Sequence, residues 1–417
     1  MISRTFGTGE RHPSIVSVIR TSEIRYESID FQEMVEAVLG ELEHEGVSLP
    51  SKGTVFIKPN LLLSASATTG ITTEPRLVAA LVRNLLSRGV EHVFVGDSSA
   101  GFANIADALD STGMRKMVEE AGGKVVDVDV AEERIDLPLA GSDILTQISV
   151  PKKVVEADFL INFSKLKTHR FGAMTGAVKN WVGLIEKNTR LRHHQNQLPK
   201  LVAELHKLLP EDLCLTDALI IGEGDGPDLC SPRLLGVLLA SNDPVASDSV
   251  ASELLSIDRN ELIFPWTAYL DGIGEIHRNL IRVVGCDARE IAIHVERPIE
   301  VLYNRFPCNI VMGGMCPGCF VWFIGPALFW EKEGLWDKIS TAKGRPTFMF
   351  GFNANDINFE RHCSEGPYFV IGDCPPERYR NDPRTIHIPG CTPGPKISDK
   401  VLAHLGLAMP IWGESNE

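Results

Sequence analysis

Thr54-Val55-Phe56-Ile57-Lys58-Pro59-Asn60 begins a segment that continues with a helical pattern over residues 75–88 and then the run His92-Val93-Phe94-Val95-Gly96. The two short apolar runs are typical of buried strands. Apolar residues between them recur at helical spacing, and the proline at position 75 suits the first turn of a helix. This strand–helix–strand succession predicts parallel strands with a helix packed on their sheet.

The same alternation extends in both directions along the chain. Further apolar runs that predict strands occupy residues 15–19, 124–128, 159–162, 213–216 and 237–240, and helical patterns occupy residues 31–42, 114–121 and 245–255. Regular alternation of this kind predicts an α/β fold, in which a mostly parallel sheet carries helices on both faces.

The pattern starts afresh near residue 298. Residues beyond it contain their own apolar runs and a helical pattern over 395–405. A chain of 417 residues is long enough for more than one core. We therefore expect a larger α/β domain over residues 1–296 and a smaller α/β domain over residues 297–417.

Composition limits the classes of partner. The net charge of −14 argues against general nucleic-acid binding, which needs a dominant basic surface. No apolar run approaches the length that crosses a bilayer, and the N-terminus lacks the pattern of a secretory signal. These features predict a cytoplasmic protein without membrane contact, in which cysteines stay reduced and favour metal binding over disulfides.

Polar clusters follow several of the predicted strands, and the segment from residue 165 to residue 194 is basic, with seven Lys or Arg and Glu186 as its only acid. Ligands of α/β sheets bind beyond the carboxyl ends of the strands. Lysines gathered there predict a crevice for a small carboxylate or phosphate. The predicted ligand-binding residues are Lys58, Asn60, Asp97, Ser98, Lys165, Asn180 and Asp243.

Three residues of this crevice are candidates for catalysis: Lys167, His169 and Lys179. An alternative is that carboxylates such as Asp217 and Asp248 pair with the lysines in purely structural ion pairs. The glycine-rich segment over residues 222–227 lacks the ending of a phosphate-binding loop, and we expect a flexible loop that lines the crevice.

Four cysteines are predicted metal ligands: Cys316, Cys319, Cys374 and Cys391. Cys316, Cys374 and Cys391 each follow a short apolar run and a glycine-bearing turn, and Cys319 completes a Cys-Pro-Gly-Cys unit. One close pair with two isolated cysteines favours a [4Fe-4S] cluster over zinc, which usually takes two close pairs. Possible substitutes among the ligands are Cys308 and Cys363, and the predicted buried free thiols are Cys214, Cys230 and Cys286.

Several motifs together resemble the DUF362 family, a group of uncharacterised α/β proteins often associated with iron–sulfur centres. The matching stretches lie between about residues 50 and 285 and include Ile57–Asn60, Val95–Ser98, Lys165–His169, Thr175–Asn180 and Asn242–Asp248. The resemblance implies the fold and an association with iron–sulfur clusters. Many members carry runs of the form Cys-x-x-Cys-x-x-Cys, which this chain lacks, so its cluster would be held differently.

The sequence favours an iron–sulfur protein that binds a small anionic metabolite and acts as a redox enzyme or with a redox partner protein. One alternative is a non-redox protein with structural zinc. Another is a proton-transfer enzyme of the racemase or lyase type, in which the crevice lysines and His169 move protons.

Overall fold

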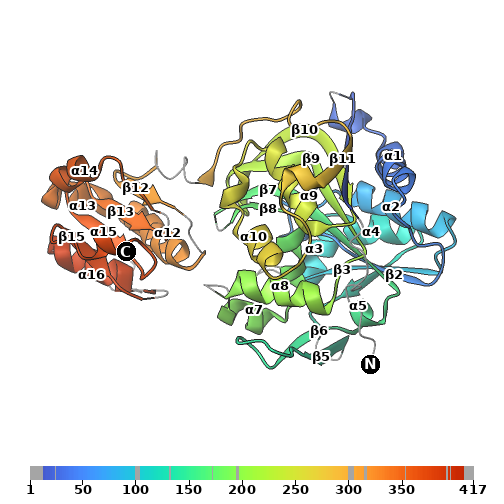
Figure 1. Ribbon diagram of the computed structural model, residues 1–417, viewed down its shortest axis with the longest axis horizontal. Helices are drawn as coiled ribbons and strands as arrows, with labels where there is room; N and C mark the ends of the chain where they lie inside the picture. Colours follow the sequence, from blue (N-terminus) through green and yellow to red (C-terminus); the bar gives the residue numbers. More distant parts are fainter. Residues whose placement is uncertain are drawn as a thin grey trace, which may run out of the picture. The chain divides into compact units, whose positions relative to one another are not determined.

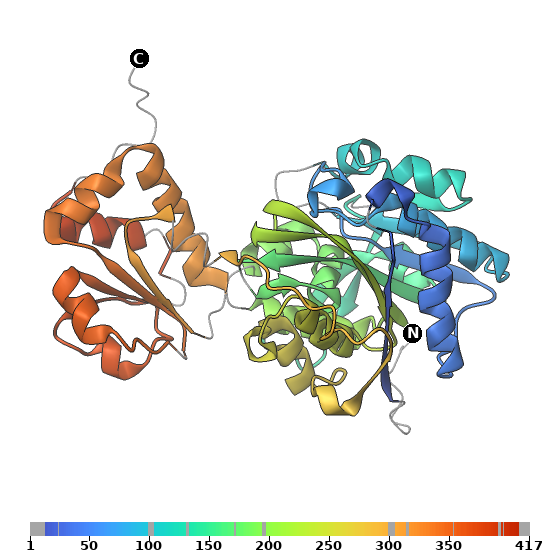
Figure 2. The same cartoon turned by 90° about the horizontal axis from the view of Figure 1, so that it is seen from above.

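The computed structural model describes residues 13–23, 25–98, 104–130, 133–170, 172–193, 197–298, 305–313, 317–352, 354–390, 393–394 and 396–407. The chain forms two compact units, drawn in Figures 1 and 2. The larger comprises residues 1–193 and 197–298, and the smaller comprises residues 194–196 and 299–417. The division after residue 298 lies beside the expected boundary, and each unit is described by itself.

The larger unit is organised around one sheet with the strand order β11-β1-β10-β9-β7-β2-β3-β4, and β8 pairs with β7. Neighbouring strands are parallel except where β10 meets β1 and β9 and where β8 meets β7. The predicted mostly parallel sheet is therefore confirmed. Its strands are β1 Ser14–Arg20, β2 Thr54–Lys58, β3 His92–Asp97, β4 Lys124–Asp127, β7 Phe159–His169, β8 Ala173–Thr175, β9 Leu213–Asp225, β10 Leu229–Ser241 and β11 Ile281–Gly285.

Helices cover both faces of this sheet (Figures 1 and 2). One face packs on α1 Phe31–His44, α2 Pro75–Ser87, α3 Ile105–Ser111 and α4 Met114–Glu120. The opposite face packs on α5 Lys152–Glu156, α6 Ala177–Asn180, α8 Leu198–Leu208, α9 Pro244–Leu254 and α10 Ile263–Leu270. A further helix, α7, spans Lys187–His193, and a hairpin of β5 Arg134–Pro138 and β6 Gln147–Pro151 forms a separate small sheet.

The interior of strand β2 is apolar. Val55 and Ile57 pack in the core formed with α1 and α2, whereas Phe56 belongs to the core on the other face, which also contains Trp181 and Phe264. Successive side chains of a strand point to opposite faces, so the interior of a strand covered on both sides is mostly apolar. In β2 the charged residue comes last, at Lys58.

Two segments differ from their predicted structure. Strand β7 continues seven residues past the predicted end at residue 162, so Lys165, Lys167 and His169 lie within a strand and not after one. The predicted flexible loop over residues 222–227 is wrong for its first four residues, because Gly222 to Asp225 belong to β9 and pair with β10. Long antiparallel pairing of β9 with β10 keeps these glycines in regular structure.

The smaller unit has a four-stranded parallel sheet in the order β12-β13-β14-β15. Its strands are β12 Asn309–Met312, β13 Thr347–Phe350, β14 Tyr368–Ile371 and β15 Thr385–Ile388. Its helices are α12 Pro317–Lys332, α13 Leu335–Lys343, α14 Phe359–Glu365, α15 Glu377–Arg380 and α16 Lys396–Leu405. This is the smaller α/β fold that the sequence predicts. Among the helices of the described residues, none has the length and apolar character needed to span a membrane.

Candidate functional site: a lysine-lined crevice

The predicted crevice lies where β2 and β7 run side by side in parallel. From this point the sheet continues through β3 and β4 on one side and through β9 on the other. The chain leaves β2 for α2 on one face, and it leaves β7 through β8 for α6 on the opposite face. Neighbouring strands whose connections diverge in this way open a crevice at their carboxyl ends, the usual ligand site of α/β sheets.

Lys58 ends β2 and is almost completely buried. Its Nζ lies 2.6 Å from Oδ1 of Asp97, which ends the neighbouring strand β3, and the other carboxylate oxygen of Asp97 accepts the backbone N–H of Leu61 at 2.7 Å. Burial lowers the pKa of Lys58, and the charge of Asp97 opposes that shift. The pair is compensated within the fold and fixes the loop after β2.

Two asparagines connect Lys58 to a second lysine. The Asn180 side-chain oxygen accepts hydrogen bonds from Lys58 Nζ at 3.2 Å and from Asn60 Nδ2 at 3.1 Å. With its amide nitrogen so engaged, Asn60 turns its oxygen to Lys167, whose Nζ donates to it at 3.0 Å. The orientation of the Asn60 amide is therefore set by Asn180.

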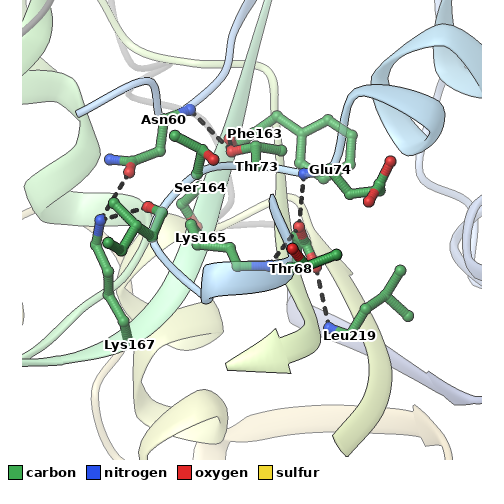
Figure 3. Close-up of polar contacts among 12 residues, drawn as sticks. Asn60, Thr68, Thr73, Glu74, Phe163, Ser164, Lys165, Lys167 and Leu219 are labelled. Carbon is green, nitrogen blue, oxygen red and sulfur yellow. Dashed lines mark hydrogen bonds and ion pairs between the residues drawn. The ribbon is translucent and has the colours of Figure 1, made fainter. Parts of the chain in front are cut away.

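Lys165 plays a structural part. Its buried Nζ lies 2.8 Å from Oδ2 of Asp217, and the same carboxylate accepts the backbone N–H groups of Glu74 and Leu219 (Figure 3). In-register pairing of β7 with β9 places Lys165 opposite Asp217. This is the structural ion pair that the sequence left as an alternative for the lysines, and it accounts for Lys165.

Lys167 differs from both. Its side chain is 1% exposed, and its Nζ donates to the Ile71 carbonyl at 2.6 Å as well as to Asn60 (Figure 3). In the described part of the chain, no carboxylate lies within ion-pair distance of this ammonium group. Burial lowers the pKa of Lys167 to about 7, and the charges of Lys179 and Lys165 act in the same direction.

An unsatisfied hydroxyl lies next to Lys167. Thr175 of β8 is directly opposite Lys167 of β7, and directly opposed residues of an antiparallel pair project to the same face of the sheet. Thr175 is 3% exposed, and its Oγ1 has no hydrogen-bond partner in the described structure. Buried hydroxyls are nearly always hydrogen-bonded, so this group indicates a missing partner.

Two further cations complete the positive field. Half-buried Lys179 lies on α6 with its Nζ 5.5 Å from the ring centre of Phe264, and its pKa is lowered to about 8 by burial and by the charges of Arg190 and Lys58. Among the described residues, no carboxylate lies within ion-pair distance of Lys179. Burial also lowers the pKa of Arg190, and Asp129, Asp97 and Glu186 oppose that shift.

A buried network of hydrogen bonds continues from Asn180 into the core. Asn180 Nδ2 donates to Asn162 Oδ1 at 2.8 Å, and Asn162 Nδ2 donates to Glu211 Oε1 at 3.0 Å. The other oxygen of Glu211 lies 2.7 Å from His206 Nδ1, while His206 Nε2 lies 2.9 Å from the Val178 carbonyl. With an acceptor at each ring nitrogen, His206 is held as an imidazolium, and its pKa is raised although burial alone would lower it.

The remaining predicted residues occupy other places. Ser98 is buried and hydrogen-bonds Asp129, and His169 is buried at the end of β7 opposite Ala173. The Asp243 carboxylate caps α9 by accepting the N–H groups of Val245 and Ala246, and it also accepts Ser14 Oγ and the Glu275 N–H. The hydrogen bonds of Asp243 are thus used within the fold, apart from the lysine network.

Asp248, offered by the sequence as a partner for a lysine, binds backbone instead. Its two oxygens accept the N–H groups of Ala177 and Val178 at 2.6 and 3.1 Å, at the start of α6. A Cβ at Gly176 would lie 2.0 Å from the same carboxylate, so glycine is needed there. Burial raises the pKa of Asp248 to about 7. Asp248 positions the helix that carries Lys179 and Asn180.

In the smaller unit, the structure describes Cys319 and Cys374, whereas Cys316 and Cys391 lie outside the described residues. Cys319 is buried and lies in the first turn of α12. A Cβ at Gly372 would lie 2.8 Å from Cys319 Sγ and 3.4 Å from the Gly390 carbonyl. The sulfur therefore lies close to Gly372, two residues before exposed Cys374.

The other two candidate ligands lie elsewhere. Cys308 is buried one residue before β12 begins, at the amino end of that strand, and Cys363 lies in the last turn of α14, shortly before β14 begins. In the sequence, Cys316, Cys374 and Cys391 follow β12, β14 and β15. Parallel pairing places the carboxyl ends of these strands along one edge of the sheet.

Sequence reasoning missed two groups at the crevice, Thr175 and Cys230. Thr175 lies in one of the motif stretches, but nothing in its spacing shows that its hydroxyl lacks a partner. Cys230 was expected to be a buried thiol, yet it is half-buried and close enough to Lys167 to influence its pKa. Both depend on strand register, which the sequence did not reveal.

Comparison with known proteins finds a family that matches part of the larger unit. Residues 55–253 match the sequence model of a family described as a domain of unknown function, DUF362. A thylakoid-associated protein of Synechocystis sp. is 28% identical over 249 residues, which span 58% of this chain and 75% of that protein. The match to the family model includes Lys58, Lys165, Lys167 and Lys179, and it confirms the resemblance seen in the motifs.

Two solved structures are similar at low identity. The lactate racemase apoprotein of Thermoanaerobacterium thermosaccharolyticum is 12% identical, with a TM-score of 0.39 over 97% of this chain and 92% of that one. A Thermotoga maritima protein is 14% identical, with a TM-score of 0.33 over 83% of this chain and 78% of that one. Both TM-scores are too low for either protein to indicate a function for this chain.

The contrast between Lys165 and Lys167 generates a test on stability. Lys165→Met leaves the Asp217 carboxylate buried without its counter-charge, and we expect unfolding free energy to fall by about 3–5 kcal/mol. Lys167→Met removes a buried cation that has no described counter-charge, so we expect a loss under about 1 kcal/mol or a net gain. Urea denaturation of the two variants at pH 7 measures both. Equal losses would show that Lys167 is structural as well.

Proposed function

Because residues 55–253 of this chain form a DUF362 domain, we propose that this domain binds a small anionic ligand, a carboxylate or a phosphate, at Lys167. One observation carries the proposal: Lys167 is fully buried among the described residues without a carboxylate partner, beside the unsatisfied hydroxyl of Thr175. An anion between them would supply the counter-charge and accept both hydrogen bonds.

The chemistry of the donors supports this ligand class. A lysine ammonium has three N–H donors, and two of those of Lys167 are engaged by Asn60 and Ile71. The remaining donor and the Thr175 hydroxyl can both donate to oxygen atoms of one ligand. Hydrogen bonds to a charged group contribute about 1.5–3 kcal/mol each, more than those between neutral groups. The neighbouring charge of Lys179 adds to the attraction.

Sulfate is a suitable probe, because its charge is constant over the range in which the lysines titrate. Lys167 is an ammonium below its pKa of about 7, and Lys179 is one below about 8. Sulfate should therefore raise the melting temperature of the larger unit strongly at pH 6, and at pH 9 only by its general effect on protein stability, at constant ionic strength. Differential scanning calorimetry measures the shift.

Lys167→Met is the matched control, since it keeps the general effect of sulfate on protein stability. Identical sulfate shifts in the wild type and this variant at pH 6 would contradict the proposal. In chloride, without sulfate, the pH dependence has the opposite sign, because stability then rises with pH. The unfolded chain holds the Lys167 proton up to its ordinary pKa of 10.5, so the stability that Lys167 contributes rises with pH from about 7 to 10.5.

For the smaller unit we propose a [4Fe-4S] cluster held by Cys316, Cys319, Cys374 and Cys391. The described residues fit this group: Cys319 Sγ touches Gly372, and the strand ends that precede the other cysteines share one edge of the sheet. When bound, the cluster would supply one-electron transfer, which makes the protein a redox enzyme or the partner of a redox protein.

Metal analysis tests this part of the proposal. Protein purified without oxygen should be brown, contain about four iron atoms per chain and lose its visible absorbance on reduction with dithionite. Cys319→Ser and Cys374→Ser should lose most of the iron, whereas Cys363→Ser, at the other end of the strands, should keep it. A colourless protein with about one zinc per chain would support the structural-zinc alternative instead.

Proton transfer is a second candidate function, and the pKa of Lys167 favours it. A lysine with a pKa of about 7 can accept a proton at neutral pH, as a general base must. If Lys167 removes the α-hydrogen of a bound carboxylate, protein in D₂O should introduce deuterium at that carbon, as NMR detects. Lys167→Arg keeps the charge and removes the base, so it should bind sulfate but exchange nothing. Undiminished exchange in that variant would exclude Lys167 as the base.

A further inference from the structure

A thiol lies beside Lys167, although neither the ligand site nor the metal centre uses it. Cys230 lies on β10, and its Sγ would lie 2.7 Å from a Cβ at Gly222 on β9. Gly222 is in turn the parallel partner of Lys167 on β7. Paired residues of neighbouring strands project to the same face, so Cys230 fills the position that a side chain at Gly222 would occupy, next to Lys167.

Electrostatics agree with this placement. After burial, the strongest influence on the pKa of Lys167 is Cys230, and the strongest influence on that of Cys230 is Lys167. Burial raises the pKa of the thiol to about 11, and Lys167 opposes the shift. Near neutral pH the pair therefore contains a thiol and a lysine that is partly in its amine form.

The surroundings point to a ligand at this pair. Thr175 flanks Lys167 on β8 with an unsatisfied hydroxyl, and Lys167 keeps one donor unused among its described contacts. Cys230 is half-buried, whereas Lys167 and Thr175 are almost completely buried. A carboxylate held by Lys167 and Thr175 would have its carbon chain beside this sulfur.

We propose that Cys230 is the nucleophile of the crevice and that its substrates are small carboxylates with an electrophilic carbon. This inference rests on the proposed anion site and names the substrate class of that site. The Lys167 amine accepts the thiol proton, and the ammonium group so formed donates to the substrate carboxylate. The sulfur then bonds to the electrophilic carbon, and the leaving group departs with the electron pair of the broken bond. With iodoacetate the leaving group is iodide, and the product is S-carboxymethyl cysteine.

The pair of reagents iodoacetate and iodoacetamide tests the proposal, because they differ in the carboxylate alone. The full-length protein is treated with each at pH 7.5, and peptide mass spectrometry gives the alkylation rates of Cys230 and of Cys286, a half-buried thiol on a different segment. The ratio of the iodoacetate rate to the iodoacetamide rate should be at least about tenfold higher at Cys230 than at Cys286. One charge-assisted hydrogen bond to the carboxylate accounts for a difference of that size.

Three comparisons decide the result. Lys167→Met should reduce the ratio at Cys230 to that at Cys286, Thr175→Val should reduce it in part, and sulfate should slow iodoacetate at Cys230 alone. Equal ratios at the two cysteines, or a Cys230 inert to both reagents, would overturn the role of Cys230. If sulfate still stabilises the protein through Lys167, the anion site survives that failure; if it does not, the proposed function fails as well.

Discussion

The arrangement of this site depends on one constraint: a buried lysine that has no counter-charge among the residues that the structure describes. The ammonium groups of Lys58 and Lys165 each have an aspartate within 2.8 Å. Lys167 has an amide oxygen and a carbonyl instead, and its pKa is about 7. Charges in protein interiors are normally paired because desolvation is costly. A bound anion, as proposed above, would supply the counter-charge that Lys58 and Lys165 receive from aspartates.

Strand register and hydrogen bonds together determine the surroundings of Lys167. The divergence of the chain after β2 and β7 opens the crevice, and the break in register between β7 and β9 separates Lys165, which meets Asp217, from Lys167, which meets Gly222. Behind them, the Asn180–Asn162–Glu211–His206 network is closed by hydrogen bonds of 2.7–3.0 Å. Networks satisfied in this way hold side chains rigidly, so the Asn60 oxygen that meets Lys167 has little freedom.

The sequence predicted much of this and missed what depends on register. Apolar runs and helical spacing predicted the parallel sheet. Lys58, Asn60, Asp97 and Asn180, which the sequence assigned to one ligand site, lie together in one hydrogen-bonded cluster. Residue spacing does not show which lysine meets a carboxylate, so Lys165 and Lys167 looked equivalent. The segment from Gly222 to Asp225 looked like a loop because glycines are common in loops, but pairing with β10 makes it a strand. That pairing places Cys230 beside Lys167.

The most direct test of the central claim is the pKa of Lys167 itself. Protein labelled with ¹³C at lysine Cε, with Lys167→Arg to assign the signal, reports the protonation of each lysine by NMR. Without added anion, the Lys167 signal should titrate near pH 7, and sulfate should move its midpoint upward, because a bound anion stabilises the ammonium form. A midpoint near 10.5 that ignores sulfate would contradict the account, since the lysine would then be neither desolvated nor in contact with the anion.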